Sequence, residues 1–130
     1  MKKFFSNQGP LIAWTVLIFW LSSLHHVPHI KTPILSSDKI AHILVYFVLC
    51  WFSSRAFFHQ RAIAVLTEHS LVAGFVFTCI YGYFDEVHQL FVPGRNYDYY
   101  DMLADASGAL IFILVALAWK SFATRRSTRG

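Results

Sequence analysis

The sequence predicts an all-α integral membrane protein, a four-helix transmembrane bundle in a single domain that covers residues 1–130. Of the 130 residues, 56% are hydrophobic and 14% are charged, and the mean hydropathy is +0.48. A soluble domain carries about a quarter charged residues, and a chain of this length holds one domain. The apolar residues also gather in four runs, each close to the ~20 residues with which a helix crosses a bilayer. Helices are expected because isolated strands leave backbone groups unpaired in lipid.

The four expected helices cover about residues 4–24, 40–58, 71–92 and 102–122. The first follows Lys2 and Lys3, as the apolar segment of a signal peptide does, but no small-residue cleavage site follows it. We therefore expect it to be retained as the first membrane helix. Between the third and fourth helices, Pro93 and Gly94 predict a sharp turn.

Cys50 and Cys79 fall inside the second and third expected helices. Counting about 1.5 Å of rise per residue places the two thiols at different depths in the membrane. We therefore expect both cysteines to be free packing residues rather than a disulfide.

Charged residues are distributed unevenly between the two ends of the predicted bundle. Eight of the eleven Lys and Arg residues fall on the side of the two termini and the connection at 59–69, whereas six of the seven acids fall on the other side. Lys and Arg concentrate in cytoplasmic loops. Both termini are therefore predicted to be cytoplasmic, with the connections at 25–39 and 93–101 facing outward. We interpret the net charge of +4 as a topology signal and not as a nucleic-acid-binding face.

Ionisable residues occur near the outward end of the second helix, although a charge at the membrane centre costs about 2.5–3.5 kcal/mol. At about 100° per residue, Asp38, His42 and Tyr46 share one face of this helix. Simpler explanations remain open for two of them, because Asp38 can cap the helix and Tyr46 can lie at the membrane interface.

The third and fourth helices bring further polar groups to the same end. The third ends with Tyr81, Asp85, Glu86, His88 and Gln89, which we expect on one arc facing the bundle unless this helix end already lies in water.

The fourth helix begins with Asp101 and Asp105, one turn apart, and Asp98 shares their face if it is helical. The helix dipole favours acids in a first turn, which is a sufficient reason for Asp98 and Asp101 but not for the deeper Asp105. Arg95, after the predicted turn, is expected to return over the same end of the bundle, and Gly108 to allow close helix packing.

These groups define a candidate site with two sets of residues. Carboxylates bind divalent cations or act as acid and base, and an arginine suits a phosphate or a carboxylate. The predicted catalytic residues are Asp38, His42, Glu86, Asp101 and Asp105. The predicted substrate-binding residues are Tyr46, Asp85, Gln89 and Arg95. The cofactor is left open: a divalent metal is one candidate, and His25, His26 and His29 are additional candidate ligands for it.

The order and spacing of these polar residues resemble the VanZ-like membrane protein family. The resemblance covers residues 37 to about 115 and rests on Ser37-Asp38-Lys39-x-x-His42-x-x-x-Tyr46, Asp85-Glu86-x-x-Gln89-x-x-Val92-Pro93-Gly94-Arg95 and Asp101-x-x-x-Asp105-x-x-Gly108. The chain departs from the family at Asp105, where members often have Asn. The resemblance implies a small multi-pass bacterial membrane protein of the cell envelope, in a family named for a member linked to resistance to the glycopeptide antibiotic teicoplanin.

Three functions fit this pattern. The first is an enzyme of the bacterial cytoplasmic membrane that acts from the outer leaflet on a lipid-linked cell-envelope substrate, such as a polyprenyl phosphate, or on a phospholipid headgroup. The second is a non-catalytic binder or transporter component for envelope lipid or antibiotic. The third is a structural membrane protein, in which a buried polar network fixes helix packing without chemistry. Membrane lipid is the expected partner in the first two, and nucleic acid in none of them.

Overall fold

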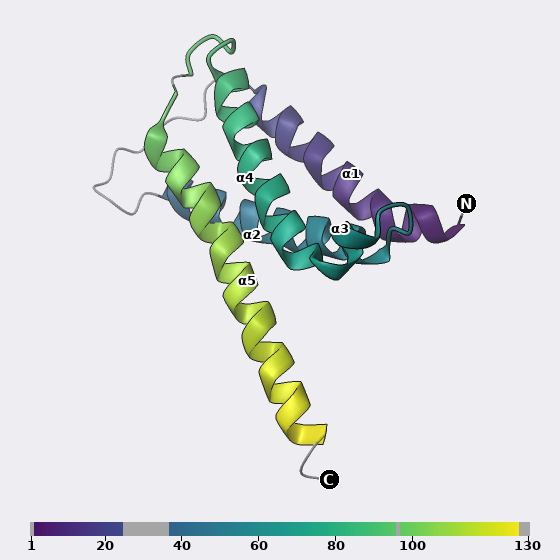
Figure 1. Ribbon diagram of the computed structural model, residues 1–130. Helices are drawn as coiled ribbons and strands as arrows, with labels where there is room; N and C mark the ends of the chain where they lie inside the picture. The colour runs from purple at the N-terminus through teal and green to yellow at the C-terminus, as the bar shows by residue number, and fades with distance from the viewer. Residues whose placement is uncertain (1, 25–36, 96, 128–130) are drawn as a thin grey trace.

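The computed structural model describes residues 2–24, 37–95 and 97–127, and all regular structure within these ranges is helical. The elements are α1 (Lys2–Ser22), α2 (Ser37–His59), α3 (Ala64–Glu68), α4 (Ser70–Gln89) and α5 (Tyr99–Ser127) (Figure 1). Four of them, α1, α2, α4 and α5, are long and apolar enough to cross a membrane. The predicted all-α bundle with four spans is confirmed, and His25, His26 and His29 lie outside the described residues.

All four long helices differ from the expected ranges at their ends, and the structure gives a reason for α4 and α5. α4 ends at Gln89, because residues 90–92 already belong to the turn that leads to α5. α5 starts earlier and runs on to Ser127, with Arg125 and Arg126 in its last turn. Basic side chains stabilise the C-terminal end of a helix dipole, so α5 continues past its apolar segment. The short α3 lies in the connection that we expect from the sequence to be a loop.

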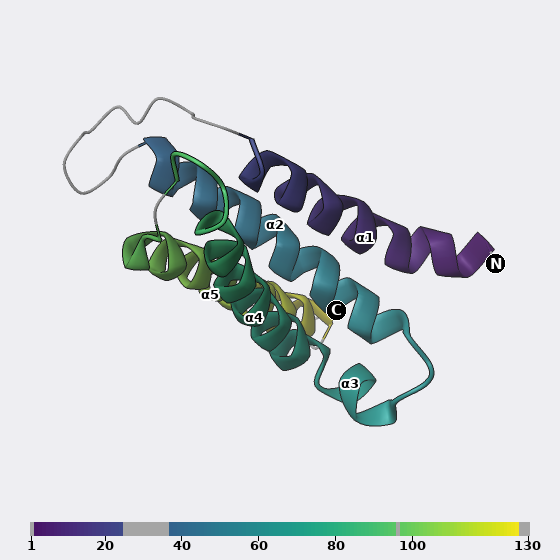
Figure 2. The same cartoon turned by 90° about the horizontal axis from the view of Figure 1, so that it is seen from above.

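α2 is the central helix, with α1 on one side and α4 and α5 on the other (Figure 2). The Trp14 indole N–H of α1 donates a hydrogen bond to the backbone carbonyl of Val45, at 3.1 Å. Nearer the N-terminus, Pro10 has no N–H to donate to the carbonyl of Ser6. That carbonyl accepts a hydrogen bond of 3.0 Å from the Arg55 guanidinium instead, so the proline in α1 provides an anchor for α2.

Small residues allow α2 to approach its other two neighbours closely. The Ser53 hydroxyl donates to the carbonyl of Gly74 in α4, at 3.2 Å. A Cβ atom at Gly74 would clash with Ser54, and one at Gly108 of α5 would clash with the backbone of Ile43. Such contacts between small residues are typical of membrane helices, which associate by packing rather than by the hydrophobic effect.

The outward faces of the helices are apolar. Exposed side chains include Phe5, Trp20, Leu44, Phe84 and Trp119. A soluble monomer rarely exposes so much apolar surface, whereas lipid tails solvate it. Together with the four long apolar helices, this surface fits a multi-pass membrane protein. Both cysteines are free, as the sequence predicts.

Candidate functional site

The start of α2, the end of α4 and the start of α5 lie at the same end of the bundle (Figures 1 and 2). Polar side chains from these three places gather there, and we call them the polar cluster: Asp38, Lys39, His42, Tyr46, Asp85, Glu86, Gln89, Asp98, Asp101 and Asp105. The cluster contains all of the predicted site residues except Arg95.

A hydrogen-bonded pair of His42 and Asp105 joins α2 to α5 in the middle of the cluster. His42 Nδ1 lies 2.9 Å from Asp105 Oδ1, and 2% of Asp105 is exposed. Since a carboxylate accepts hydrogen bonds, we assign the proton to Nδ1. The other nitrogen, Nε2, then faces Asp101 Oδ2 at 3.9 Å. About 15% of the His42 side chain is exposed, so Nε2 is placed to exchange a proton or to bind a cation.

A second link between α2 and α5 is made by Lys39. Its ammonium lies 2.7 Å from Asp101 Oδ1 and 3.3 Å from Asp98 Oδ2. Asp98 also caps α5, because its Oδ1 accepts a hydrogen bond of 2.8 Å from the backbone N–H of Tyr100. Lys39 is not among the predicted site residues. It could have been predicted from the sequence, because Lys39 lies in the first turn of α2 and Asp101 lies in the acidic first turn of α5, at the same end of the bundle.

Glu86 ties the end of α4 to the connection before α5. It is fully buried, and its Oε2 accepts a hydrogen bond of 3.1 Å from the backbone N–H of Asp98. Its Oε1 accepts from the Gln89 amide at 3.2 Å, and the same amide donates to Asp85 Oδ2 at 3.3 Å. Three of the predicted residues on α4 are therefore in direct contact.

The connection itself begins with the predicted turn. Gly94 has a φ of 84°, and the backbone N–H of Arg95 donates to the carbonyl of Val92 at 3.1 Å. Proline followed by a glycine with positive φ is the pattern of a type II turn, and the predicted sharp turn is confirmed. The Arg95 guanidinium makes no hydrogen bond or ion pair with any described residue. The structure therefore shows no hydrogen bond or ion pair between Arg95 and the described residues of the cluster.

Tyr46 lies beside His42 under the cluster. It is 1% exposed, and its ring stacks on the imidazole with 6.2 Å between the centroids. Gly82 of α4 leaves the space for this arrangement, because a Cβ there would lie 2.9 Å from Asp105 Oδ2 and 3.2 Å from Tyr46 Cε1. Within the described chain, the Tyr46 hydroxyl and Asp105 Oδ2 are buried without a hydrogen-bond partner. These two atoms are therefore poised to receive a ligand, a proton or a water.

Two polar residues of α4 face α1 instead of the cluster. The Tyr81 hydroxyl donates to the carbonyl of Thr15 at 2.6 Å, and His88 Nε2 lies 3.0 Å from the Ser23 hydroxyl. The polar end of α4 therefore faces the bundle, as expected, but Tyr81 and His88 do not belong to the polar cluster. They connect α1 to α4, and the acids beside them face α2 and α5.

A candidate metal centre lies within the cluster, on two half-buried residues and one buried residue. Asp38, His42 and Asp101 each offer one ligand atom, and these atoms all lie within 4.8 Å of one another. Two carboxylates and an imidazole suit a divalent cation. In addition, an imidazole whose second nitrogen donates to a carboxylate, as His42 does to Asp105, is the usual form of a metal-binding histidine.

The comparison with known families covers all of these positions. The family model described as VanZ/LLP1 matches residues 8–120. The chain belongs to the VanZ/LLP1 family. The predicted resemblance is thereby confirmed, and the VanZ/LLP1 match includes every residue of the polar cluster. Neither the curated proteins nor the solved structures gave a match.

Proposed function

We propose that this chain is a bacterial cytoplasmic-membrane protein that acts on a headgroup at the extracytoplasmic face. The substrate is a lipid-linked cell-envelope precursor, such as a polyprenyl phosphate, or a phospholipid. The observation that carries the proposal is the buried pair of His42 and Asp105, at 2.9 Å, within a cluster of acids at one end of a membrane bundle. Burying such groups in an apolar bundle costs free energy, so they are expected there only if they pair with one another or take part in a reaction.

The proposed chemistry is acid–base transfer at His42 Nε2. Asp105 holds Nδ1–H, so Nε2 is left to accept a proton from an attacking water or hydroxyl and to return it to a leaving group. Asp101 lies across from Nε2 and stabilises the imidazolium that forms in between. Glu86, held by the backbone N–H of Asp98, is the second proposed acid–base group.

An anionic headgroup needs positive charge at this site, because the carboxylates of the cluster outnumber its cations. The carboxylates are Asp38, Asp85, Glu86, Asp98, Asp101 and Asp105, and the permanent cation among them is Lys39. Repulsion in a low dielectric excludes a bare phosphate. We therefore propose that a divalent cation would be held by the carboxylates of Asp38 and Asp101, and that it would neutralise the headgroup together with Arg95 from the connection.

A structural role is the second candidate function, because several cluster groups satisfy one another. Lys39 is paired with Asp98 and Asp101, and Glu86 accepts hydrogen bonds from Gln89 and a backbone N–H. Such a network specifies helix register without chemistry. A third role, non-catalytic binding of envelope lipid or antibiotic, predicts dependence on Arg95 but not on His42.

Comparative lipid analysis separates these roles. Envelope extracts are compared from cells with no protein, with the natural chain, and with His42→Asn, Glu86→Gln or Asp105→Asn. His59→Asn is the matched control, because this exposed histidine lies at the other end of α2. We expect the amount of a lipid-linked species to differ between cells with the natural chain or the control and cells without the protein. In the three variants this difference is expected to be at least tenfold smaller. Unchanged lipids with the natural chain overturn the enzyme proposal, and loss of folded protein in all three variants supports the structural role.

Two further measurements test the cation and the resistance link. Metal analysis of the purified protein, before and after chelation, is expected to give about one divalent ion per chain and less in Asp38→Asn. Growth with teicoplanin is expected to improve when the chain is present and not when it carries Glu86→Gln. Absence of metal in the natural protein removes the cation from the proposal, and equal growth removes the resistance role.

A further inference from the structure

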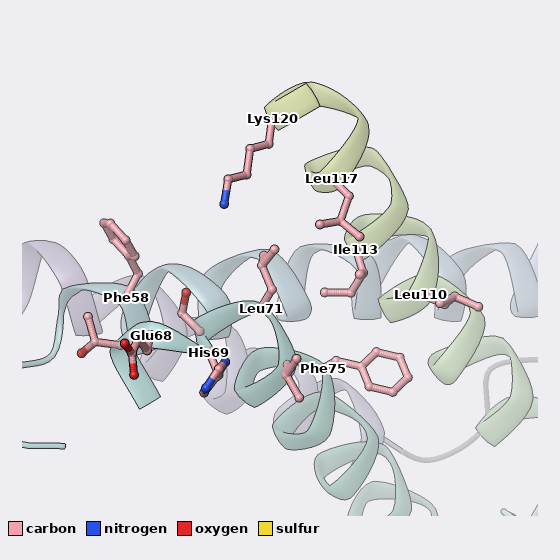
Figure 3. A pocket seen from close by; sticks show the side chains of 12 residues that line it. Phe58, Glu68, His69, Leu71, Phe75, Leu110, Ile113, Leu117 and Lys120 are labelled. Atoms are coloured by element: carbon pink, nitrogen blue, oxygen red, sulfur yellow. The ribbon is translucent and has the colours of Figure 1, made fainter. Parts of the chain in front are cut away.

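A hollow lies at the opposite end of the bundle from the polar cluster. It encloses about 470 Å³ between α3, the first turns of α4 and the C-terminal half of α5 (Figure 3). Its walls are mostly apolar and include Phe58, Leu71, Phe75, Leu110, Ile113 and Leu117, while Thr67, His69 and Ser70 add polar groups near α3. α4 and α5 meet closely at Gly82 and Asp105 and diverge toward the end of α5 (Figure 1), which opens this groove between them.

In a membrane this groove is filled with hydrocarbon. Water finds too few polar partners against such walls, and an empty space forfeits the dispersion contacts of every side chain that lines it. A second helix enters this space with about one turn only, because one turn with its side chains, about 5.4 Å long and 10 Å across, already occupies roughly 400–500 Å³. An extended acyl chain is narrower than a helix and enters along the open side.

The charges at the margin indicate the headgroup. The Lys120 side chain extends from α5 over the groove, and Glu68 of α3 lies at another margin (Figure 3). In the part of the chain that the structure describes, neither the ammonium nor the carboxylate has an ion-pair or hydrogen-bond partner. One free cation and one free anion match a headgroup with a phosphate and a primary amine better than a purely anionic one.

We propose that this groove is a binding site for one acyl chain of phosphatidylethanolamine, with Lys120 on the phosphate and Glu68 on the amine. By the predicted orientation, the lipid belongs to the cytoplasmic leaflet. The site is separate from the polar cluster, so the inference goes beyond the proposed function and does not depend on it.

The test uses the full chain in nanodiscs with equal amounts of phosphatidylethanolamine and phosphatidylglycerol, followed by native mass spectrometry of the released protein. We expect one retained phosphatidylethanolamine, at least threefold over phosphatidylglycerol. Ile113→Trp fills the groove and is expected to lower retention at least fivefold. Leu114→Trp is the matched control, because Leu114 is the next residue, is 58% exposed and does not line the groove. Glu68→Gln is expected to abolish the preference for the amine headgroup.

Several results overturn the proposal. They are equal retention of the two lipids by the natural chain, unchanged retention in Ile113→Trp, and a dimer that Ile113→Trp dissociates, which assigns the groove to a second copy. If Ile113→Trp lowers the folded yield, Glu68→Gln tests the proposal instead through the preference for phosphatidylethanolamine, because Glu68 is an exposed residue of α3 whose substitution does not disturb the packing. Lipid retention is measured by mass spectrometry and does not require activity at the polar cluster. A negative result therefore leaves the proposal for the polar cluster unchanged.

Discussion

Replacing Lys39 by methionine is expected to destabilise the bundle by about 2 kcal/mol. The substitution keeps the apolar stem and removes the ammonium that lies 2.7 Å from Asp101 Oδ1. At an effective dielectric constant of about 20, the attraction of unit charges at this distance is about 6 kcal/mol, and desolvation of both ions offsets most of it. Loss of one partner from a fully buried pair costs about 3–5 kcal/mol. The side chains of Lys39 and Asp101 are 22% and 10% exposed, so solvent screening reduces the expected loss to about 2 kcal/mol.

The assay is reversible unfolding in mixed detergent micelles, followed by tryptophan fluorescence, in a double-mutant cycle. The cycle combines Lys39→Met with Asp101→Asn, and a matched cycle uses Asp98→Asn, because Asp98 contacts the same ammonium at 3.3 Å with 43% of its side chain exposed. We expect a coupling free energy of about 1–2 kcal/mol with Asp101 and below about 0.5 kcal/mol with Asp98. Equal couplings, or a change below about 0.5 kcal/mol for Lys39→Met alone, refute the reasoning.

Three other substitutions test the packing of the helices by thermal unfolding and folded yield. Gly108→Ala is expected to lower the folded yield severely, because the added Cβ meets the backbone of Ile43. Gly9→Ala is the control and is expected to change nothing, because no atom lies within 4 Å of a Cβ at that position. Equal effects of the two substitutions contradict the packing of α5 on α2. Gly94→Ala is expected to cost about 1 kcal/mol, because its φ of 84° is strained for any residue with a Cβ, and an unchanged melting temperature argues against the turn. Trp14→Phe removes one hydrogen bond between α1 and α2 and is expected to cost about 1 kcal/mol; no loss shows that α1 is held by other contacts.

The membrane helices could be predicted from the sequence because each contains a long apolar run, and such a run forms a helix in lipid, where its backbone groups must pair with one another. The turn at Pro93 and Gly94 could be predicted because both residues restrict the backbone in ways that a helix excludes. The gathering of His42 and Asp105 at one end of the bundle could be predicted from helical periodicity and from the cost of isolated charges in a membrane, but their direct hydrogen bond could not. Because of this cost, the ionisable side chains of α2, α4 and α5 are expected to pair with one another in one cluster.

Other features depend on how the helices cross, which the sequence does not state. Periodicity places Tyr81 and Glu86 near one end of α4, but only the packed bundle shows that Tyr81 faces α1 while Glu86 faces the connection before α5. The position of Lys39 between two acids depends on the angle between α2 and α5. Likewise, the apolar groove depends on the divergence of α4 and α5, which no local sequence pattern predicts.

The central claim is that the polar cluster opens away from the cytoplasm, and cysteine labelling in intact cells tests it most directly. Tyr99→Cys is introduced into a chain in which Cys50 and Cys79 are replaced by alanine, because Tyr99 is 72% exposed and lies next to the cluster. Arg126→Cys at the other end of α5 is the matched control. We expect a membrane-impermeant maleimide to label position 99 in intact cells and position 126 only after permeabilisation. Labelling of position 99 only after permeabilisation contradicts the account.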